Sequence, residues 1–307
     1  MSQIVVGVDG GGSKTHVIVA DRRGKELASL TGDGSAVVPG EALASAEVIS
    51  QLVRDALTVA EIAERPRALV VGVAGVGREQ ERNALLRALR GEGIAEEVQV
   101  VADAEVASVD AFGDGPGILL IAGTGSVAFG RSPTGVFRRC GGWGPVCGDE
   151  GSGAWIGRRA LSVVTSSHDE REPETRLVGA LLTALELQDV DGLVGWAAAA
   201  TPKDLAALAV HVVALAADRD LRANSICTLA AEELVLHVRT LARQLFTDER
   251  ADIPVALAGG MLQRGSFLRR LVEQRLKSAV PGSHLHAEDV VPARGAVAIA
   301  LRVPAVA

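Results

Sequence analysis

Two segments of this chain carry glycine together with Ser, Thr or Lys at a sharp break between two apolar stretches. They are Val6–Asp21 (VGVDGGGSKTHVIVAD) and Leu119–Arg131 (LLIAGTGSVAFGR). Glycine supplies the positive φ angles that such turns need, and without a Cβ it lets an anion approach the backbone N–H groups. One such turn in each half of the chain indicates a site for a polyphosphate, and hence nucleotide chemistry.

Neither turn fits the two common phosphate-binding motifs. A P-loop places a glycine directly before its lysine and a helix directly after it, whereas Ser13 precedes Lys14 here and a strand-like run follows. The second turn, 123–126, has its next glycine at Gly130, so the dinucleotide-binding spacing also fails. Either turn alone is typical of an ordinary glycine-rich hairpin. Their occurrence in both halves favours the phosphate-binding interpretation.

Two carboxylates stand at the ends of predicted strands. Asp9 ends the first apolar strand, where a buried carboxylate is costly unless it is paired or bound to a metal. Asp103 follows the apolar run Val98–Ala102 and begins a predicted helix. An aspartate at a helix start is a common cap that needs no further role. The carboxyl ends of strands in α/β sheets are also where ligands bind, so both residues are candidates for chemistry.

The composition excludes several classes of protein. The 307 residues are 48% hydrophobic and 22% charged, which is typical of a globular chain that can bury two cores. A net charge of −7 argues against nucleic-acid binding. The start of the chain shows no signal segment, and the longest apolar run, Leu205–Ala217, is too short to span a membrane. Three cysteines without a C-x-x-C pair indicate neither a disulfide framework nor a zinc site. We therefore expect a cytoplasmic protein.

The pattern of apolar residues predicts the same order of elements twice. In the first half we expect strands over 3–8, 16–21, 26–31, 68–74 and 98–102, and helices over 41–59, 78–90 and 103–112. The turn-rich segment 113–117 is the predicted linker. After it come strands over 118–121, 126–131, 136–140 and 254–258, and helices over 266–277 and 293–301. We therefore predict an α/β protein with an N-terminal domain over 1–115 and a C-terminal domain over 116–307, the latter with a helical insertion at about 152–246.

Four motifs, taken in order, carry a resemblance to a known family. They are Asp9–Thr15 (DGGGSKT), Ala122–Ser126 (AGTGS), Cys140–Arg158 (CGGWGPVCGDEGSGAWIGR) and Val255–Gly260 (VALAGG). The chain resembles the N-acetylglucosamine kinase and BadF/BadG/BcrA/BcrD-type ATPase family of the actin/hexokinase/Hsp70-like superfamily, over essentially its whole length. The resemblance implies duplicated ribonuclease-H-like domains with an interdomain active-site cleft.

The resemblance also implies ATP and Mg²⁺ as cofactors. Asp9 would orient the metal, while the Ser13 hydroxyl, the Lys14 ammonium and the Thr15 backbone N–H would meet the phosphates. Lys14 could instead be a solvated side chain, and Thr124 and Ser126 could serve only to form the second turn. The residues implied to bind the nucleotide are Asp9, Gly10, Gly11, Gly12, Ser13, Lys14, Thr15, Gly123, Thr124, Gly125, Ser126, Gly259 and Gly260.

For the acceptor, the resemblance implies that Asp103 is the general base that takes the proton of the sugar hydroxyl. The residues implied to bind the substrate are Gly75, Asp103, Gly142, Trp143, Asp149 and Gly153. In related amino-sugar kinases the loop after the third strand usually carries a sugar-binding asparagine, whereas Val37 stands there in this chain. Because valine cannot hydrogen-bond a hydroxyl, the resemblance leaves open which amino sugar is bound.

The implied activity is ATP-dependent phosphorylation of an amino sugar at its 6-hydroxyl. N-acetylglucosamine is the first expectation, with glucosamine or N-acetylmuramic acid as alternatives. A rival of another class is a BadF-type ATPase that activates a dehydratase or reductase, although such relatives carry a cluster-ligating cysteine pair that these cysteines do not suggest. A third is a sugar-binding regulator without turnover. The expected partners are a small-molecule amino sugar and a second copy of the chain, without nucleic acid or membrane.

Overall fold

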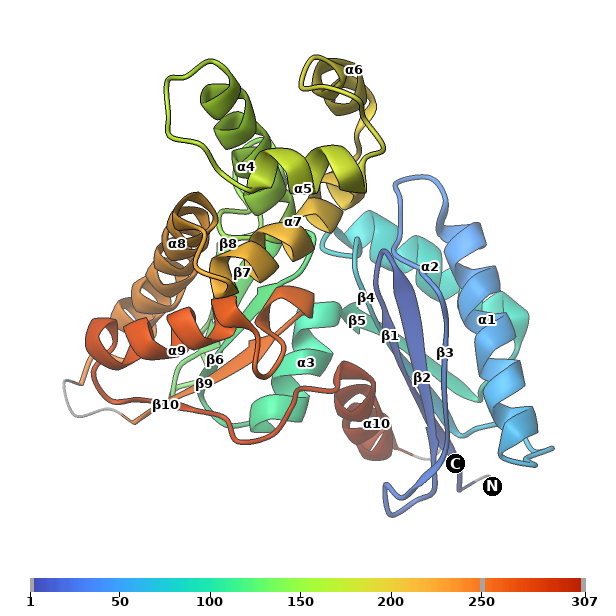
Figure 1. Ribbon diagram of the computed structural model, residues 1–307. Helices are drawn as coiled ribbons and strands as arrows, with labels where there is room; N and C mark the ends of the chain where they lie inside the picture. The colour runs from blue at the N-terminus through green and yellow to red at the C-terminus, as the bar shows by residue number, and fades with distance from the viewer. Residues whose placement is uncertain (1–2, 249–251, 305–307) are drawn as a thin grey trace. The chain divides into compact units, whose positions relative to one another are not determined.

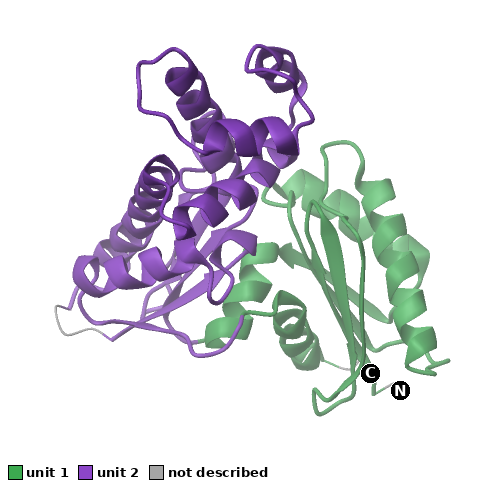
Figure 2. Cartoon of the chain, viewed as in Figure 1, with its two compact units in different colours: residues 1–114, 290–307 green, residues 115–289 purple. Residues whose placement is uncertain are grey.

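The computed structural model describes residues 3–248 and 252–304. The chain divides into two compact units, one of residues 1–114 together with 290–307 and one of residues 115–289 (Figure 2). The last helix of the chain therefore packs with the first unit, far from its neighbours in sequence.

The first unit is built on a five-stranded mixed sheet (Figure 1). Its strands are β1 (Val5–Gly10), β2 (Lys14–Ala20), β3 (Glu26–Asp33), β4 (Ala68–Val73) and β5 (Glu97–Ala102), in the order β3-β2-β1-β4-β5. The first three pair antiparallel, and β4 and β5 continue parallel to β1. The carboxyl ends of β1, β4 and β5 therefore meet at one edge of the sheet.

Helices cover both faces of this sheet. Because successive side chains of a strand point to opposite faces, Val6 packs with α1 (Ala42–Val59) and α2 (Glu79–Glu92), whereas Val5 packs with α3 (Asp103–Phe112) and α10 (Pro292–Arg302). On that second face α10 approaches closely: a Cβ at Gly7 would lie 2.4 Å from the carbonyl oxygen of Ala293. The apolar strands of this unit are thus buried on both sides.

The second unit repeats the same sheet topology. Its strands are β6 (Gly117–Ala122), β7 (Ser126–Arg131), β8 (Phe137–Gly141), β9 (Ile253–Ala258) and β10 (Ser283–Leu285), in the order β10-β9-β6-β7-β8. Again three strands pair antiparallel and two continue in parallel. This repetition confirms the predicted α/β fold of duplicated ribonuclease-H-like units. The short β10 was absent from the sequence-based prediction, because three residues are too few to show a period.

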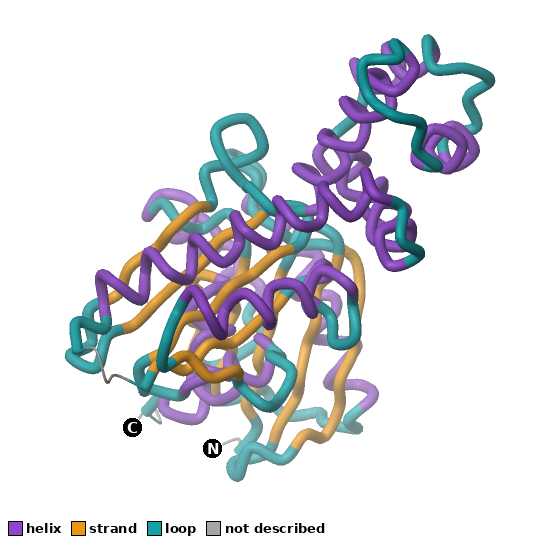
Figure 3. Tube along the Cα trace, turned by 60° about the vertical axis from the view of Figure 1, so that its left-hand side comes forward, coloured by secondary structure: helices purple, strands orange, loops and turns teal. Residues whose placement is uncertain are grey.

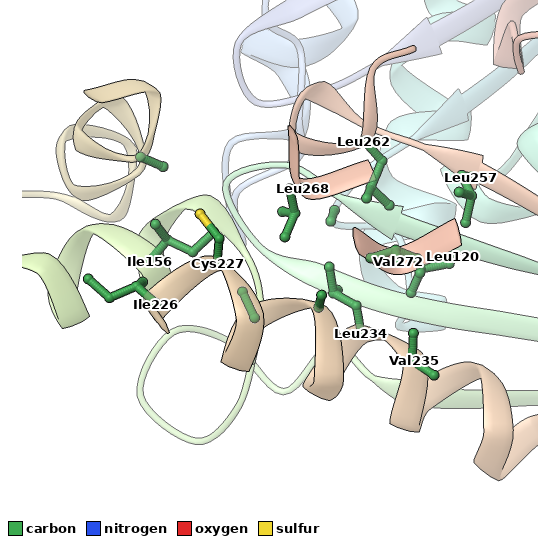
Figure 4. Packing of buried hydrophobic residues seen from close by; sticks show 14 of the residues in the cluster. Leu120, Ile156, Ile226, Cys227, Leu234, Val235, Leu257, Leu262, Leu268 and Val272 are labelled. Atoms are coloured by element: carbon green, nitrogen blue, oxygen red, sulfur yellow. The ribbon is translucent and has the colours of Figure 1, made fainter. Parts of the chain in front are cut away.

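The helices of the second unit fall in the predicted insertion and after it. They are α4 (Gly153–His168), α5 (Leu177–Ala184), α6 (Gly192–Ala199), α7 (Pro202–Ala217), α8 (Leu221–Leu245), the 3₁₀ turn η1 (Gly260–Leu262) and α9 (Phe267–Ala279). α8 and α9 pack on the sheet, where Leu234 and Val272 lie in one core with Leu120 and Leu257 (Figure 4). Figure 3 shows a group of helices beyond the ends of the strands, in the region where Figure 1 labels α4 and α6.

The helices were also assessed as membrane spans, and the cysteines as disulfide partners. No helix of the described residues is long and apolar enough to cross a membrane. The three cysteines are free, with Cys227 buried, Cys140 partly buried and Cys147 exposed.

Candidate active site

The first glycine-rich turn joins β1 to β2 and is held by two other loops of the first unit. The Gly11 N–H donates to the Lys14 carbonyl at 2.9 Å, which closes the turn. The Gly11 carbonyl accepts from the N–H groups of Ser35 and Ala36 at 3.0 and 3.1 Å. On the other side the Ala74 N–H donates to the Gly10 carbonyl at 2.9 Å. The turn is therefore fixed by the loops that follow β3 and β4.

The three polar side chains of this turn have different surroundings. Ser13 and Lys14 are exposed. Thr15 is fully buried, and its hydroxyl donates to the Asp33 carbonyl at 2.6 Å and lies 2.8 Å from the Ser35 hydroxyl. Its side chain therefore anchors the turn to the loop after β3. Ser35 is a supporting residue that the sequence analysis missed, although a serine among glycines at a strand end was a visible signal.

Asp9 and Asp103 stand at the carboxyl ends of β1 and β5, as predicted from the sequence. Burial, together with the nearby negative charge of Asp103, raises the pKa of Asp9 to about 6, while Lys14 opposes the shift. Burial also raises the pKa of Asp103, although the Ala104 N–H donates to its Oδ1 at 2.9 Å and acts the other way. The two carboxylates thus share a partly buried site in the first unit.

Gly75, a predicted substrate residue, follows β4 and touches the loop that carries Val37. Its φ is +92°, and a Cβ there would lie 2.1 Å from the Val37 carbonyl oxygen, so only glycine fits. The Val37 N–H donates to the Ala74 carbonyl at 2.9 Å. The Val37 side chain is 5% exposed and belongs to the core between the sheet, α1 and α2. Its burial explains the valine, because an amide there would need a buried hydrogen-bond partner.

In the second unit the second glycine-rich turn joins β6 to β7. The Gly123 N–H donates to the Gly125 carbonyl at 2.9 Å, and the Gly123 carbonyl accepts from the Gly153 N–H at 2.8 Å. Thr124 is exposed at the turn. Ser126 is buried, and its hydroxyl donates to the Glu150 carbonyl at 2.7 Å. As with Thr15 in the first unit, the hydroxyl of Ser126 ties the turn to a neighbouring loop, and Thr124 remains the side chain open to a ligand.

Asp149 lies against this same turn. It is buried, has a φ of +60° and accepts from the Gly144 N–H at 3.2 Å. A Cβ at Gly125 would lie 2.6 Å from Asp149 Oδ2, so the glycine makes room for the carboxylate. Burial raises the pKa of Asp149, whereas hydrogen bonds from the Gly144 and Ser126 backbone act to lower it. The predicted sugar loop and the predicted phosphate turn are therefore in contact within one unit.

Helix α8 packs against the loop that carries Gly142 and Trp143. Trp143 is 68% exposed, with the Arg139 guanidinium 4.7 Å from its ring centroid, so it is not a core anchor. His237 of α8 is buried, and its ring occupies the space that a Cβ at Gly141 would need. His237 Nδ1 lies 2.7 Å from the Glu233 carbonyl. This role could not be predicted from the sequence, because His237 stands about a hundred residues from the loop it supports.

Gly259 and Gly260 follow β9, beside the second turn. β9 runs parallel to β6, so its carboxyl end meets that of β6. At Gly259, where φ is +92°, a Cβ would lie 2.3 Å from the Ala122 carbonyl oxygen. The structure thus brings Gly123, Asp149, Gly153 and Gly259 together in the second unit, and Asp9, Lys14, Gly75 and Asp103 in the first.

Comparison with known proteins identifies the family. The model of the BadF/BadG/BcrA/BcrD ATPase family matches residues 6–300. The chain belongs to this ATPase family. This confirms the resemblance drawn from the four motifs.

Three relatives illustrate the match. The N-acetylmuramic acid/N-acetylglucosamine kinase of Clostridium acetobutylicum is 31% identical over 86% of this chain and 87% of its own. The N-acetyl-D-glucosamine kinase of Dictyostelium discoideum is 31% identical over 97% of this chain and 98% of its own. The crystal structure of a candidate N-acetylglucosamine kinase from Chromobacterium violaceum is 29% identical, with a TM-score of 0.83, and covers 98% of this chain and 99% of its own.

The residues of this family member also fit a magnesium ion. Among the residues that the structure describes, no group of three or more His, Cys, Asp or Glu is placed to hold a metal by itself. Mg²⁺ is usually bound through one or two carboxylates together with substrate phosphates rather than in a protein cage. The partly buried Asp9, next to the first glycine-rich turn, is a carboxylate of this kind.

Proposed function

We propose that this BadF-family ATPase is a kinase that transfers the γ-phosphoryl group of ATP to the 6-hydroxyl of an amino sugar, N-acetylglucosamine first. The observation that carries the proposal is that two relatives, each 31% identical over most of the chain, are both kinases with N-acetylglucosamine in their names. The intact Asp103, the two turns and the Trp143–Asp149 loop support it.

In this proposal each polar group has one task. Asp103 accepts the proton of the sugar hydroxyl while the hydroxyl oxygen bonds to the γ-phosphorus. The bond between the γ-phosphorus and the bridging oxygen of the β-phosphate breaks at the same time, which releases ADP. Lys14 and the N–H groups of both turns stabilise the phosphates, and Asp149 accepts a hydrogen bond from a sugar hydroxyl. A Mg²⁺ ion held by Asp9 through water would supply further charge neutralisation at the phosphates. Catalysis of this type is mostly positioning and electrostatic stabilisation.

The second substrate candidate is N-acetylmuramic acid, because the Clostridium relative is named for both sugars. The experiment that tests the proposal measures ADP release with N-acetylglucosamine, glucosamine, N-acetylmuramic acid, glucose and water as acceptors. We expect turnover with an acetylated amino sugar to exceed that with glucose and with water. Equal ADP release with and without sugar would contradict the kinase and favour an ATPase that drives another protein.

We also propose that the chain forms a homodimer, which light scattering in solution would test.

A further inference from the structure

Arg139 of the second unit contacts the loop that carries Gly142 and Trp143. It belongs to β8, and the central carbon of its guanidinium lies 4.7 Å from the centroid of the Trp143 ring. A Cβ at Gly142 would lie 4.0 Å from the Arg139 Cδ. Arg139 therefore lies beside two residues that are proposed to bind the acceptor, yet the kinase reaction described above gives it no role.

The charge of Arg139 is not neutralised by a neighbouring carboxylate. Its side chain is exposed and forms no hydrogen bond or ion pair with any residue that the structure describes. A guanidinium that stacks on an aromatic ring uses its face, so the N–H groups in its plane stay available as donors. Such a group pairs with a carboxylate through two parallel hydrogen bonds. Arg139 can therefore meet an anionic group of a ligand that lies beside Trp143.

The other charges of this loop would repel an anionic ligand. Asp149, which is proposed to bind a sugar hydroxyl, accepts from the N–H of Gly144 at 3.2 Å, and Gly144 directly follows the tryptophan. Glu150 adds a second negative charge next to Asp149. Arg158 also contacts the loop, but its Nη1 donates to the Pro145 carbonyl at 2.6 Å. An acceptor with a carboxylate would therefore need a further cation here, because like charges at short range repel one another.

We propose that Arg139 determines specificity for acceptor sugars that carry a carboxylate, by pairing its guanidinium with that group while the sugar lies beside Trp143. This inference rests on the proposed function, in which an amino sugar is the acceptor. N-acetylmuramic acid has the required chemistry, because it is N-acetylglucosamine with a lactyl ether that ends in a carboxylate. The charge of Arg139 then favours this acid over an uncharged sugar of the same shape.

The test compares the binding of N-acetylmuramic acid with that of its methyl ester, which lacks the charge, by calorimetric titration of the full chain in the presence of a non-hydrolysable ATP analogue. We expect wild type to bind the acid more tightly than the ester, and added salt to reduce this preference. Arg139→Gln should lower the ratio of the two affinities about fivefold, the upper end for an exposed ion pair, and Arg139→Lys should retain part of it. Arg138→Gln is the matched control. It removes an exposed charge from the same strand, but neighbouring residues of a strand point to opposite faces, so the ratio should not change.

A purely structural role of Arg139 would give a different result. If its contact only supports the Trp143 ring, Arg139→Gln weakens the binding of acid and ester by the same factor, and the unchanged ratio overturns the proposal. Wild type that binds the ester as tightly as the acid overturns it as well. Titration with N-acetylglucosamine separates this failure from that of the proposed function. If N-acetylglucosamine binds while the acid is not preferred over its ester, only the role of Arg139 is wrong, whereas no binding of any of the three sugars contradicts the amino-sugar kinase and the role of Arg139 together.

Discussion

At the scale of single residues, the proposed general-base role of Asp103 gives the most direct test of the kinase reaction. We expect Asp103→Asn to lower kcat by about 10²-fold or more, the usual size of a general-base contribution. Nucleotide affinity should change little, because the proposed role concerns the acceptor hydroxyl. Steady-state kinetics and a nucleotide titration of the same variant separate the two quantities. Near-normal turnover would mean that Asp103 serves only as the first residue of α3, where its Oδ1 accepts a hydrogen bond from the Ala104 N–H.

The pH dependence of turnover follows from the same residue. A general base must be deprotonated, so the rate falls as pH drops through its pKa. Burial raises the pKa of Asp103, so we expect kcat/KM to fall with decreasing pH at a higher pH than an ordinary aspartate would give. The residual activity of Asp103→Asn should lack this limb. If the variant keeps the limb, the titrating group is another one, with Asp9 the first to examine.

The surroundings of the Val37 side chain could not be predicted from the sequence. Comparison with related kinases placed an asparagine there, and the sequence could not tell whether the side chain faces a ligand or the core. The structure buries Val37 among the side chains of α1, α2 and the sheet. We therefore expect Val37→Asn to lower the free energy of unfolding by ~1–3 kcal/mol and not to lower KM for N-acetylglucosamine. Denaturant unfolding and kinetics on one preparation check both, and an improved KM would show that the side chain can reach the sugar.

At the scale of single elements, the contact of the second turn with the Asp149 loop yields a paired prediction. Gly125→Ala should raise KM for both nucleotide and sugar, by about tenfold, a change of ~1.4 kcal/mol, because its Cβ would displace the Asp149 carboxylate. Gly179→Ala in α5 is the control, since a Cβ there meets nothing within 4 Å and Gly179 is not one of the proposed binding residues. Equal kinetics for the two variants would show that Asp149 tolerates the shift.

Most elements were predictable because apolar periodicity and glycine-rich breaks are local signals. Strands such as β1 and β4 are continuous apolar runs, and the two turns follow from glycine spacing. The burial of the Thr15 and Ser126 hydroxyls was not predictable, since it depends on the backbone of Asp33 and Glu150, which are 18 and 24 residues away. Supporting contacts of this kind are visible only once the loops are placed in space.

At the scale of the whole molecule, the first unit is completed by the end of the chain. Buried residues of α10, among them Ala293, Ala296 and Val297, close the core face that Val5 and Val70 leave open. Arg67 fixes this arrangement, because its guanidinium donates to the Val303 carbonyl at 2.9 Å. A local sequence pattern predicts the helix but not the sheet on which it packs, since the small residues of α10 would suit either sheet.

The completed unit leads to the last prediction. A fragment of residues 3–114 lacks α10, so an apolar face of its sheet would be exposed, and we expect no cooperative thermal transition. A permuted fragment, with residues 290–304 joined ahead of residue 3 by about six Gly and Ser residues, should unfold cooperatively. A short linker suffices because both ends contact one residue: the Arg67 backbone N–H donates to the Ile4 carbonyl at 2.9 Å, and its guanidinium donates to Val303. Circular dichroism melting compares the two fragments. Equal, cooperative melting of both would mean that α10 is dispensable to the first unit, whereas cooperative melting of the permuted fragment alone would establish that the unit is built from both ends of the chain.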